Sequence, residues 1–189
     1  MSQLSRENRV SSLQASSGAW KQWIPALVWL GIITFESTDL LSSEHTGSIL
    51  YAALTRLFGP INTFAFLEWH HYARKLGHVF GYAMLSYLLF RAWRATLPRV
   101  SNPLWSISWA SIACFMTALV ASLDEWHQTF LPSRTGTLWD VLLDSSAALG
   151  AQVLIWIFLH NRRRNQEERF SRGTTSSSKA ETTAKAAET

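Results

Sequence analysis

The chain has 189 residues, 48% of them hydrophobic, and carries a formal net charge of +4, a size that suits one domain. The single cysteine, Cys114, lies in an apolar block and excludes an intramolecular disulfide and a cysteine-based zinc site. The basic residues cluster beside apolar blocks and do not alternate with base-stacking aromatic residues, so we expect no nucleic-acid partner despite a pI of about 9.6.

The first apolar block follows a polar arm. Residues 1–19 contain several serines and charges, and we interpret them as a flexible cytoplasmic arm. The block runs from about Trp20 to Phe35, with Pro25 near its start, where a helix tolerates proline. It has the length of a signal-peptide core, but no small-residue cleavage site follows it, which favours an uncleaved membrane anchor.

A long polar segment, Glu36 to about Arg74, comes next. Ser42-Ser43 could cap a helix that continues through Phe58 and is ended by Gly59-Pro60. Apolar residues recur in this stretch at helical spacing, which predicts a helix lying on the outer leaflet or across the bundle. A second helix is predicted to begin near Asn62-Thr63 and to continue into the next apolar block.

Three further apolar blocks follow, at Leu76–Phe90, Val100–Leu123 and Val141–His160. Spanning a membrane takes about 20 apolar residues, so amphipathic flanks must lengthen the shorter blocks. A soluble helical bundle is the alternative, but it would need an amphipathic pattern in Val100–Leu123, which is apolar all round. We therefore predict an all-α integral membrane bundle of about four transmembrane helices, with an interfacial helix in the first outer loop.

The charges predict how these helices are oriented. Arginine-rich segments precede the first block, separate the second and third, and follow the fourth, whereas the alternate loops hold most of the acidic residues. Four crossings with both termini inside place every arginine-rich segment in the cytoplasm, as the positive-inside rule requires. Four cations would then lie outside, which suggests that they are used: Arg56, Arg74, Lys75 and Arg134.

The domain organisation follows from the same pattern. Residues 20–160 form the predicted transmembrane domain, and residues 161–189 form a basic and then disordered cytoplasmic tail, which lacks large apolar residues from Ser171 onward. In the fourth block, Ala147 and Ala151, with Gly150 nearby, predict a small face for close helix packing.

Ionisable residues at membrane depth are the first candidates for function, because they are costly there unless paired or wet. Lys75, His78 and Tyr82 fall at i, i+3 and i+7 and therefore share one helix face. A structural role is the alternative, in which a neighbouring helix satisfies His78 and the Lys75 side chain extends to the headgroups.

A second polar group lies where the third helix ends and the fourth begins. It comprises Asp124, Glu125, Gln128, Arg134, Asp140 and Asp144. Adjacent residues on a helix point about 100° apart, so one of Asp124 and Glu125 can face the bundle and the other the loop. Carboxylates near a histidine and cations can provide an acid and a base. Alternatively, they form a buried salt-bridge network that fixes the outer loops.

Metal and nucleophile chemistry have little support in the sequence. The available ligands show no specific spacing such as H-E-x-x-H: His70, His71, His78, Asp124, Glu125 and His127. A phosphate-binding glycine-rich loop and a G-x-S-x-G elbow are both absent. We therefore expect no metal and no cofactor.

Three motifs succeed one another along the chain. They are Ser37-Thr38-Asp39 with Ser42–Thr46, then Arg74–His78 with Tyr82, then the run Asp124–Arg134 followed by Asp140 and Asp144. Together they resemble the VanZ-like membrane proteins over roughly Thr34 to Ile155, and the D-E-x-x-Q-x-F-x-P-x-R run is long and specific. Two positions depart from the resemblance, because many members have Asn at Asp144 and Gly at Ala147.

The resemblance implies a multi-pass plasma-membrane protein of the bacterial cell envelope, in a family named after a member linked to resistance to the glycopeptide teicoplanin. It does not supply a reaction, so whether the chain is an enzyme stays open. By motif match, the family's polar positions fall on Lys75, His78, Tyr82, Asp124, Glu125, Gln128, Arg134 and Asp140.

Three hypotheses for the function remain. In the first, the chain binds or modifies a polar ligand at its outward face, such as a lipid-linked wall precursor, a lipid headgroup or a glycopeptide. Its enzymatic form uses Glu125 or Asp124 as a general base and His78 to orient or relay a proton. Ligand binding would then fall to Lys75, Tyr82, Gln128, Arg134, Asp140 and Asp144.

In the second hypothesis, the polar network is structural and the chain is a non-enzymatic scaffold, acting as a homo-oligomer or with another membrane protein. The third is a transporter of protons or a small ion, for which four crossings are few and no repeated half is visible.

The orientation can be tested with single cysteines at Ser133 and Ser101 in a Cys114→Ser background. An impermeant thiol reagent on intact spheroplasts should label position 133, which is predicted outside, and should leave position 101 unlabelled. Equal labelling at the two positions would contradict the predicted orientation.

Overall fold

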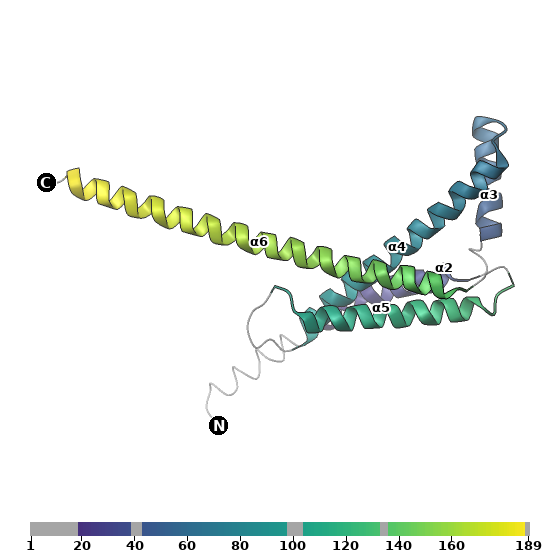
Figure 1. The fold of residues 1–189 in the computed structure, drawn as a ribbon, viewed down its shortest axis with the longest axis horizontal. Helices are drawn as coiled ribbons and strands as arrows, with labels where there is room; N and C mark the ends of the chain where they lie inside the picture. Colours follow the sequence, from purple (N-terminus) through teal and green to yellow (C-terminus); the bar gives the residue numbers. More distant parts are fainter. Residues whose placement is uncertain (1–18, 39–42, 98–103, 133–135, 188–189) are drawn as a thin grey trace, which may run out of the picture. The chain divides into compact units, whose positions relative to one another are not determined.

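The computed structural model describes residues 19–38, 43–97, 104–132 and 136–187, and in these ranges it is helical with no strand (Figure 1). The elements are a 3₁₀ turn and five α-helices: η1 (Trp20–Gln22), α2 (Ile24–Glu36), α3 (Ser43–Phe58), α4 (Thr63–Thr96), α5 (Ile107–Gln128) and α6 (Leu138–Ala187). The all-α prediction is confirmed. The chain forms two units, which meet between Gln152 and Val153, and the first contains every element up to the early turns of α6.

The start of α4, the end of α3 and the first turn of α2 are set by capping and turn residues that were identified from the sequence. The Asn62 side chain accepts hydrogen bonds from the backbone N–H groups of Phe64 and Ala65, and so caps α4. The helix α3 ends at Phe58, and Gly59 takes a φ of 85°, a left-handed conformation that glycine adopts without strain. Pro25 lies in the first turn of α2, as expected.

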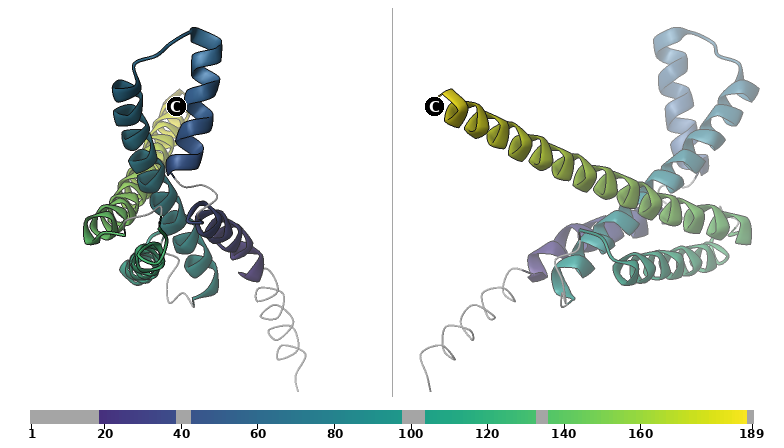
Figure 2. Two further views of the ribbon diagram at one scale, coloured as in Figure 1. Left: turned by 90° about the vertical axis from the view of Figure 1, so that its right-hand side faces the viewer. Right: turned by 60° about the vertical axis from the view of Figure 1, so that its left-hand side comes forward.

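The helix α4 is the element against which α2, α3 and α5 pack. The start of α2 meets the end of α4, where the rings of Trp23 and Trp93 lie 5.0 Å apart and the Trp23 indole donates to Thr96. The helix α3 lies beside the N-terminal part of α4 (Figure 2), and Tyr51 contacts Phe66 there. Because α2 runs antiparallel to α4, its last residues come back to the middle of α4.

The helix α5 is also antiparallel to α4. Phe90, near the end of α4, packs on Trp109 at the start of α5, whereas Tyr82 bonds to Asp124 near the end of α5. The end of α5 therefore returns to the same part of α4 as the end of α2.

The first turns of α6 run parallel to α4. Gln152 donates to the hydroxyl and carbonyl oxygens of Ser86, and the Ser86 hydroxyl donates to the carbonyl of Ala148. These polar contacts are buried and join the two helices. Ala148 is fully buried, whereas Gly150 is exposed with open space around it. Of the predicted small face, Ala147 and Ala151 are half-buried and Gly150 is exposed, whereas the most buried row of α6 is formed by every fourth residue and contains Ala148.

Two helices are long and apolar enough to cross a membrane among the described residues. They are α5 and the stretch Leu138–Gln166 of α6. The helix α2 has 13 residues and is too short to cross a membrane by this measure. The uncharged run of α4 at Leu76–Phe90 is flanked by cations, so α4 has no sufficiently apolar stretch of the required length. The prediction of about four crossings therefore stays a prediction.

The tail differs from its prediction. The helix α6 continues to Ala187, although the sequence predicted disorder from Ser171 onward. Alanine, lysine and glutamate are strong helix formers, and a helix that is already nucleated extends through them at little cost. The predicted arm, most of it at 1–18, and Ser42 lie outside the described residues.

Candidate functional site

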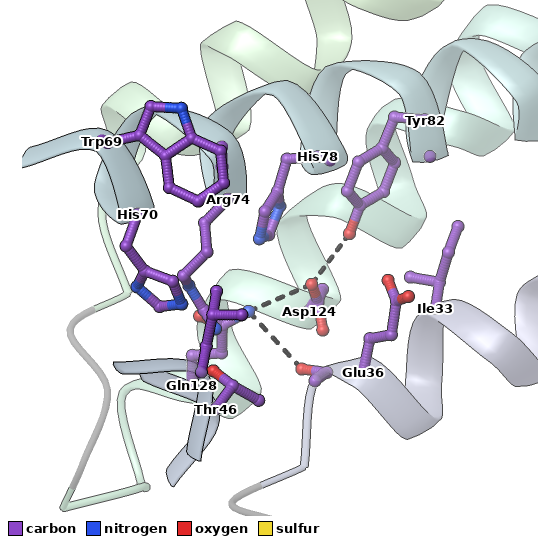
Figure 3. Close-up of a pocket in the computed structure, with 15 residues that line it drawn as sticks. Ile33, Glu36, Thr46, Trp69, His70, Arg74, His78, Tyr82, Asp124 and Gln128 are labelled. Carbon is purple, nitrogen blue, oxygen red and sulfur yellow. Dashed lines mark hydrogen bonds between the residues drawn. The ribbon is translucent and has the colours of Figure 1, made fainter. Parts of the chain in front are cut away.

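The candidate site lies where the ends of α2 and α5 and the beginning of α6 meet the middle of α4. Its first part is a chain of hydrogen bonds on Asp124 (Figure 3). The hydroxyl of Tyr82, which is 1% exposed, donates to Oδ2 of Asp124 at 2.8 Å. The Gln128 amide donates to the same oxygen at 3.1 Å and to the Ser37 hydroxyl at 3.4 Å. Helices α2, α4 and α5 are thereby joined through one carboxylate.

These residues form one wall of a cavity of about 380 Å³. The lining residues come from α2, Ser37, α3, α4 and α5: Ile33, Glu36, Ser37, Thr46, Leu50, Trp69, His70, Ala73, Arg74, Gly77, His78, Gly81, Tyr82, Asp124 and Gln128. Figure 3 shows the side chains of His70, Arg74, His78 and Asp124 gathered around this space. The lining is mixed, with charged and hydroxyl groups beside aliphatic and indole surface, so it can hold a molecule that has both polar and apolar parts.

His70 and Arg74 form the side of the cavity that α3 covers. His70 is buried and stacks on Phe66, and a side chain at Gly47 of α3 would touch its ring. Burial, together with the nearby positive charge of Arg74, lowers the pKa of His70 from its ordinary value. His70 is therefore a neutral hydrogen-bonding group at pH 7, and positive charge on this side comes from Arg74.

The second part of the site lies between α4 and the start of α6. Lys75 Nζ is 3.4 Å from Oδ1 of Asp140, so the two side chains form an ion pair between α4 and α6. Thr137 caps α6, because its hydroxyl donates to Oδ2 of Asp140 and accepts from the Asp140 backbone N–H. The backbone N–H of Thr137 donates to Oε2 of Glu125 at 2.8 Å. Glu125 thus binds the loop, while its neighbour Asp124 faces the cavity.

His78 belongs to both parts of the site. Its side chain lines the cavity, and its Nδ1 lies 3.5 Å from Oδ2 of Asp144 on α6. Asp144 is 0% exposed and Glu125 is 4% exposed. The site therefore contains two buried carboxylates beside one imidazole, on three different helices.

The structure brings most of the predicted site residues together. Those that share this region are Lys75, His78, Tyr82, Asp124, Glu125, Gln128, Asp140 and Asp144. Arg134 and Ser133 lie outside the described residues, so the expected contribution of Arg134 stays a prediction. Convergence in space does not assign chemical roles, and the expected catalytic and binding roles stay predictions as well.

Three further residues of the site were not singled out from the sequence. Ser37 is buried and bonds to Gln128, and Thr137 holds both Glu125 and Asp140. Gly136 lies so close to the Glu125 carbonyl oxygen that a Cβ there would overlap it. The family-like S-T-D motif was a signal for Ser37, but no local pattern pointed to the other two, because their contacts cross from α5 to the start of α6.

Replacing Gly136 tests this close approach. We expect Gly136→Ala to push the α5–α6 loop away, break the bond from Thr137 to Glu125, and lower stability by about 1–3 kcal/mol. Gly150→Ala is the matched control, because Gly150 has open space around it and alanine favours a helix. Thermal unfolding in detergent measures both variants, and equal melting temperatures for Gly136→Ala and the unmodified chain would contradict the arrangement.

The family relationship agrees with this geometry. The model of the VanZ/LLP1 family matches residues 22–159, which is more than half of the chain and includes every described residue of the site. No curated protein and no solved structure matches the chain. The family match covers one of the two apolar helices that are long enough to cross a membrane and most of the other. The chain belongs to the VanZ/LLP1 family and is a membrane protein of the VanZ type.

Proposed function

We propose that the cavity between α2, α3, α4 and α5 binds a polar ligand at the outward face of the bacterial plasma membrane. The candidates are a lipid-linked wall precursor, a lipid headgroup and a glycopeptide. The observation that carries the proposal is the composition of the cavity wall, where Arg74, Asp124 and His78 stand beside the apolar surface of Ile33 and Trp69. A lipid-like ligand, with a charged headgroup attached to an apolar chain, would match these charged and apolar parts of the wall.

The chemistry of the wall supports an anionic or hydroxyl-bearing ligand. Arg74 offers a guanidinium, which binds phosphate or carboxylate through two parallel hydrogen bonds. Among the described residues, Tyr82 and Gln128 donate to Asp124, and both hydrogen bonds reach Oδ2 and leave Oδ1 to other donors. A ligand hydroxyl can therefore donate to Asp124 while Arg74 holds the anionic group.

The proposal includes the orientation of the chain, with about four crossings and both termini in the cytoplasm. Exposed apolar side chains support burial of α2 and α4 in lipid, although these helices are short or flanked by charge. They include Leu27, Val28 and Phe35 on α2, and Leu76 and Phe80 on α4. Soluble monomers rarely expose contiguous apolar surface of this kind. The lipid bilayer is the partner that this surface fits.

An enzymatic form of the proposal uses the same groups. Asp124 or Glu125 would act as a general base, His78 would orient or relay a proton, and Lys75 or Arg134 would hold an anionic group. The proximity of His78 to Asp144 and Glu125 supports this form, because buried carboxylates near an imidazole can exchange a proton with it.

A structural role is the second candidate, and the hydrogen bonds themselves favour it. Tyr82, Gln128 and Lys75 each join two helices through a carboxylate or hydroxyl. A chain whose polar groups are used in this way could act as a scaffold for a second copy of itself or for another membrane protein.

Ligand binding to the purified full chain in nanodiscs separates the two candidates. The probes are phosphatidylglycerol in the nanodisc, a soluble analogue of a pyrophosphate-linked wall precursor, and teicoplanin. We expect Arg74→Gln and Asp124→Asn each to raise the Kd of the bound probe by about tenfold or more, because each removes the charge that strengthens the hydrogen bonding to the ligand. Glu68→Gln is the control, since Glu68 is exposed on α4 and does not line the cavity.

The outcomes distinguish the proposals. Binding that is weakened in the two cavity variants and unchanged in Glu68→Gln supports a ligand site. If none of the probes binds and the cavity variants lose only thermal stability, the ligand site is wrong and the scaffold role is supported.

A further inference from the structure

Three side chains from three helices place potential metal-ligand atoms close together. They are His78 of α4, Glu125 of α5 and Asp144 of α6, and one ligand atom from each lies within 4.8 Å of the other two. Glu125 and Asp144 are buried, and His78 is partly buried. This cluster lies behind the cavity wall and shares only His78 with the lining.

Asp144 is the unusual member of the cluster. It is 0% exposed, and neither of its carboxylate oxygens has a hydrogen-bond partner among the described residues. Nδ1 of His78 lies 3.5 Å from Oδ2 of Asp144, beyond the usual length of an N–H···O hydrogen bond, and also lacks a hydrogen-bond partner among the described residues. The cation of Lys75 is paired with Asp140 instead. A buried carboxylate without hydrogen bonds is costly, and the 3.5 Å contact with the His78 imidazole is the ion-pair contact that it makes among the described residues.

The distances fit a bound cation. Bonds of about 2.0–2.2 Å from a metal to nitrogen and oxygen place neighbouring ligand atoms about 3–4.4 Å apart. The separation of 3.5 Å between His78 and Asp144 falls in this range, and a small side-chain movement brings Glu125 into it. The backbone N–H of Thr137, bound to Oε2 of Glu125, would orient that carboxylate from outside the metal site.

We propose that His78, Glu125 and Asp144 bind one divalent transition-metal cation, of which Zn²⁺ is the first to test. Two carboxylates balance the charge of the cation, and the imidazole favours zinc and other transition metals over Mg²⁺ and Ca²⁺. Three protein ligands leave a coordination position open for water or a ligand, as in catalytic zinc sites. The inference departs from the sequence-based expectation of no metal, because ligands on three separate helices leave no local spacing pattern.

Metal binding can be measured on the full chain in detergent, without any organic ligand. The protein is stripped with a chelator and titrated with Zn²⁺, Mn²⁺ and Mg²⁺ by calorimetry, and its metal content after gel filtration is measured by mass spectrometry. We expect one Zn²⁺ per chain, tighter binding of Zn²⁺ than of Mg²⁺, and a loss of affinity of about a hundredfold or more in Asp144→Asn and His78→Ala.

Matched controls exclude adventitious binding at surface groups. His71→Ala removes an exposed histidine from the same helix, and Glu68→Gln removes an exposed carboxylate, so both should keep the wild-type affinity. If a site variant fails to fold, the absorption spectrum of the Co²⁺-loaded wild-type chain supplies a second measurement, because nitrogen and oxygen coordination gives d–d bands and no sulfur charge-transfer band.

Three results would overturn the proposal: no stoichiometric Zn²⁺ or Mn²⁺, equal affinity in wild type and Asp144→Asn, or a loss in His71→Ala as large as in His78→Ala. The metal measurement uses no lipid, precursor or glycopeptide. Failure of the metal site therefore leaves the proposed ligand cavity standing, and failure of the cavity leaves the metal site standing.

Discussion

The cost of burying charged groups among apolar helices is the constraint on which the rest of the structure depends. Asp144 and Glu125 are almost inaccessible, and Asp124 lies beside them in a bundle whose outer surface is apolar. Such groups persist only where neighbours compensate them. The hydroxyl of Tyr82 compensates Asp124, and the backbone of Thr137 compensates Glu125. Only for Asp144 do the described residues offer no hydrogen bond, which is why the cluster around it points to a cation.

The topology explains how one short chain gathers these groups. The helix α4 passes through the site, α2 and α5 run antiparallel to it and end there, and α6 begins there. Residues near helix ends are close to the loops, whose polar groups can reach them, as the backbone N–H of Thr137 reaches Glu125. Under the proposed function, this site binds a ligand whose polar part lies at the membrane surface and whose apolar part lies in lipid.

Features that depend on a few neighbouring residues, such as helix caps and helix ends, could be predicted from the sequence. The cap at Asn62 and the stop at Gly59 are determined within a few residues, and both were located correctly. Both partners of the ion pair of Lys75 with Asp140 were among the candidate residues, because the family-like motifs placed them among polar positions. The packed face of α6 was not located, because it is set by contacts with a distant part of the chain, such as the hydrogen bond from Ser86 to the backbone carbonyl of Ala148.

The parts of the site that were not predicted depend on long-range placement. Nothing near Gly136 in the sequence indicates that its hydrogen atoms face the carbonyl of Glu125. Likewise, the tail after Ser171 has a composition typical of disorder, yet its alanines, lysines and glutamates also extend a helix that has already formed. Helix faces and loop contacts of this kind follow from the assembled bundle and not from spacing along the chain.

The central claim is that the polar residues of α4 and α5 form one energetically coupled unit. A double-mutant cycle between Tyr82→Phe and Asp124→Asn, measured by equilibrium unfolding of the full chain in mixed micelles, tests it most directly. The 2.8 Å bond between a buried hydroxyl and a carboxylate predicts a coupling free energy of about 1–3 kcal/mol. Additive effects of the two substitutions would mean that the two residues do not interact, and would contradict the account.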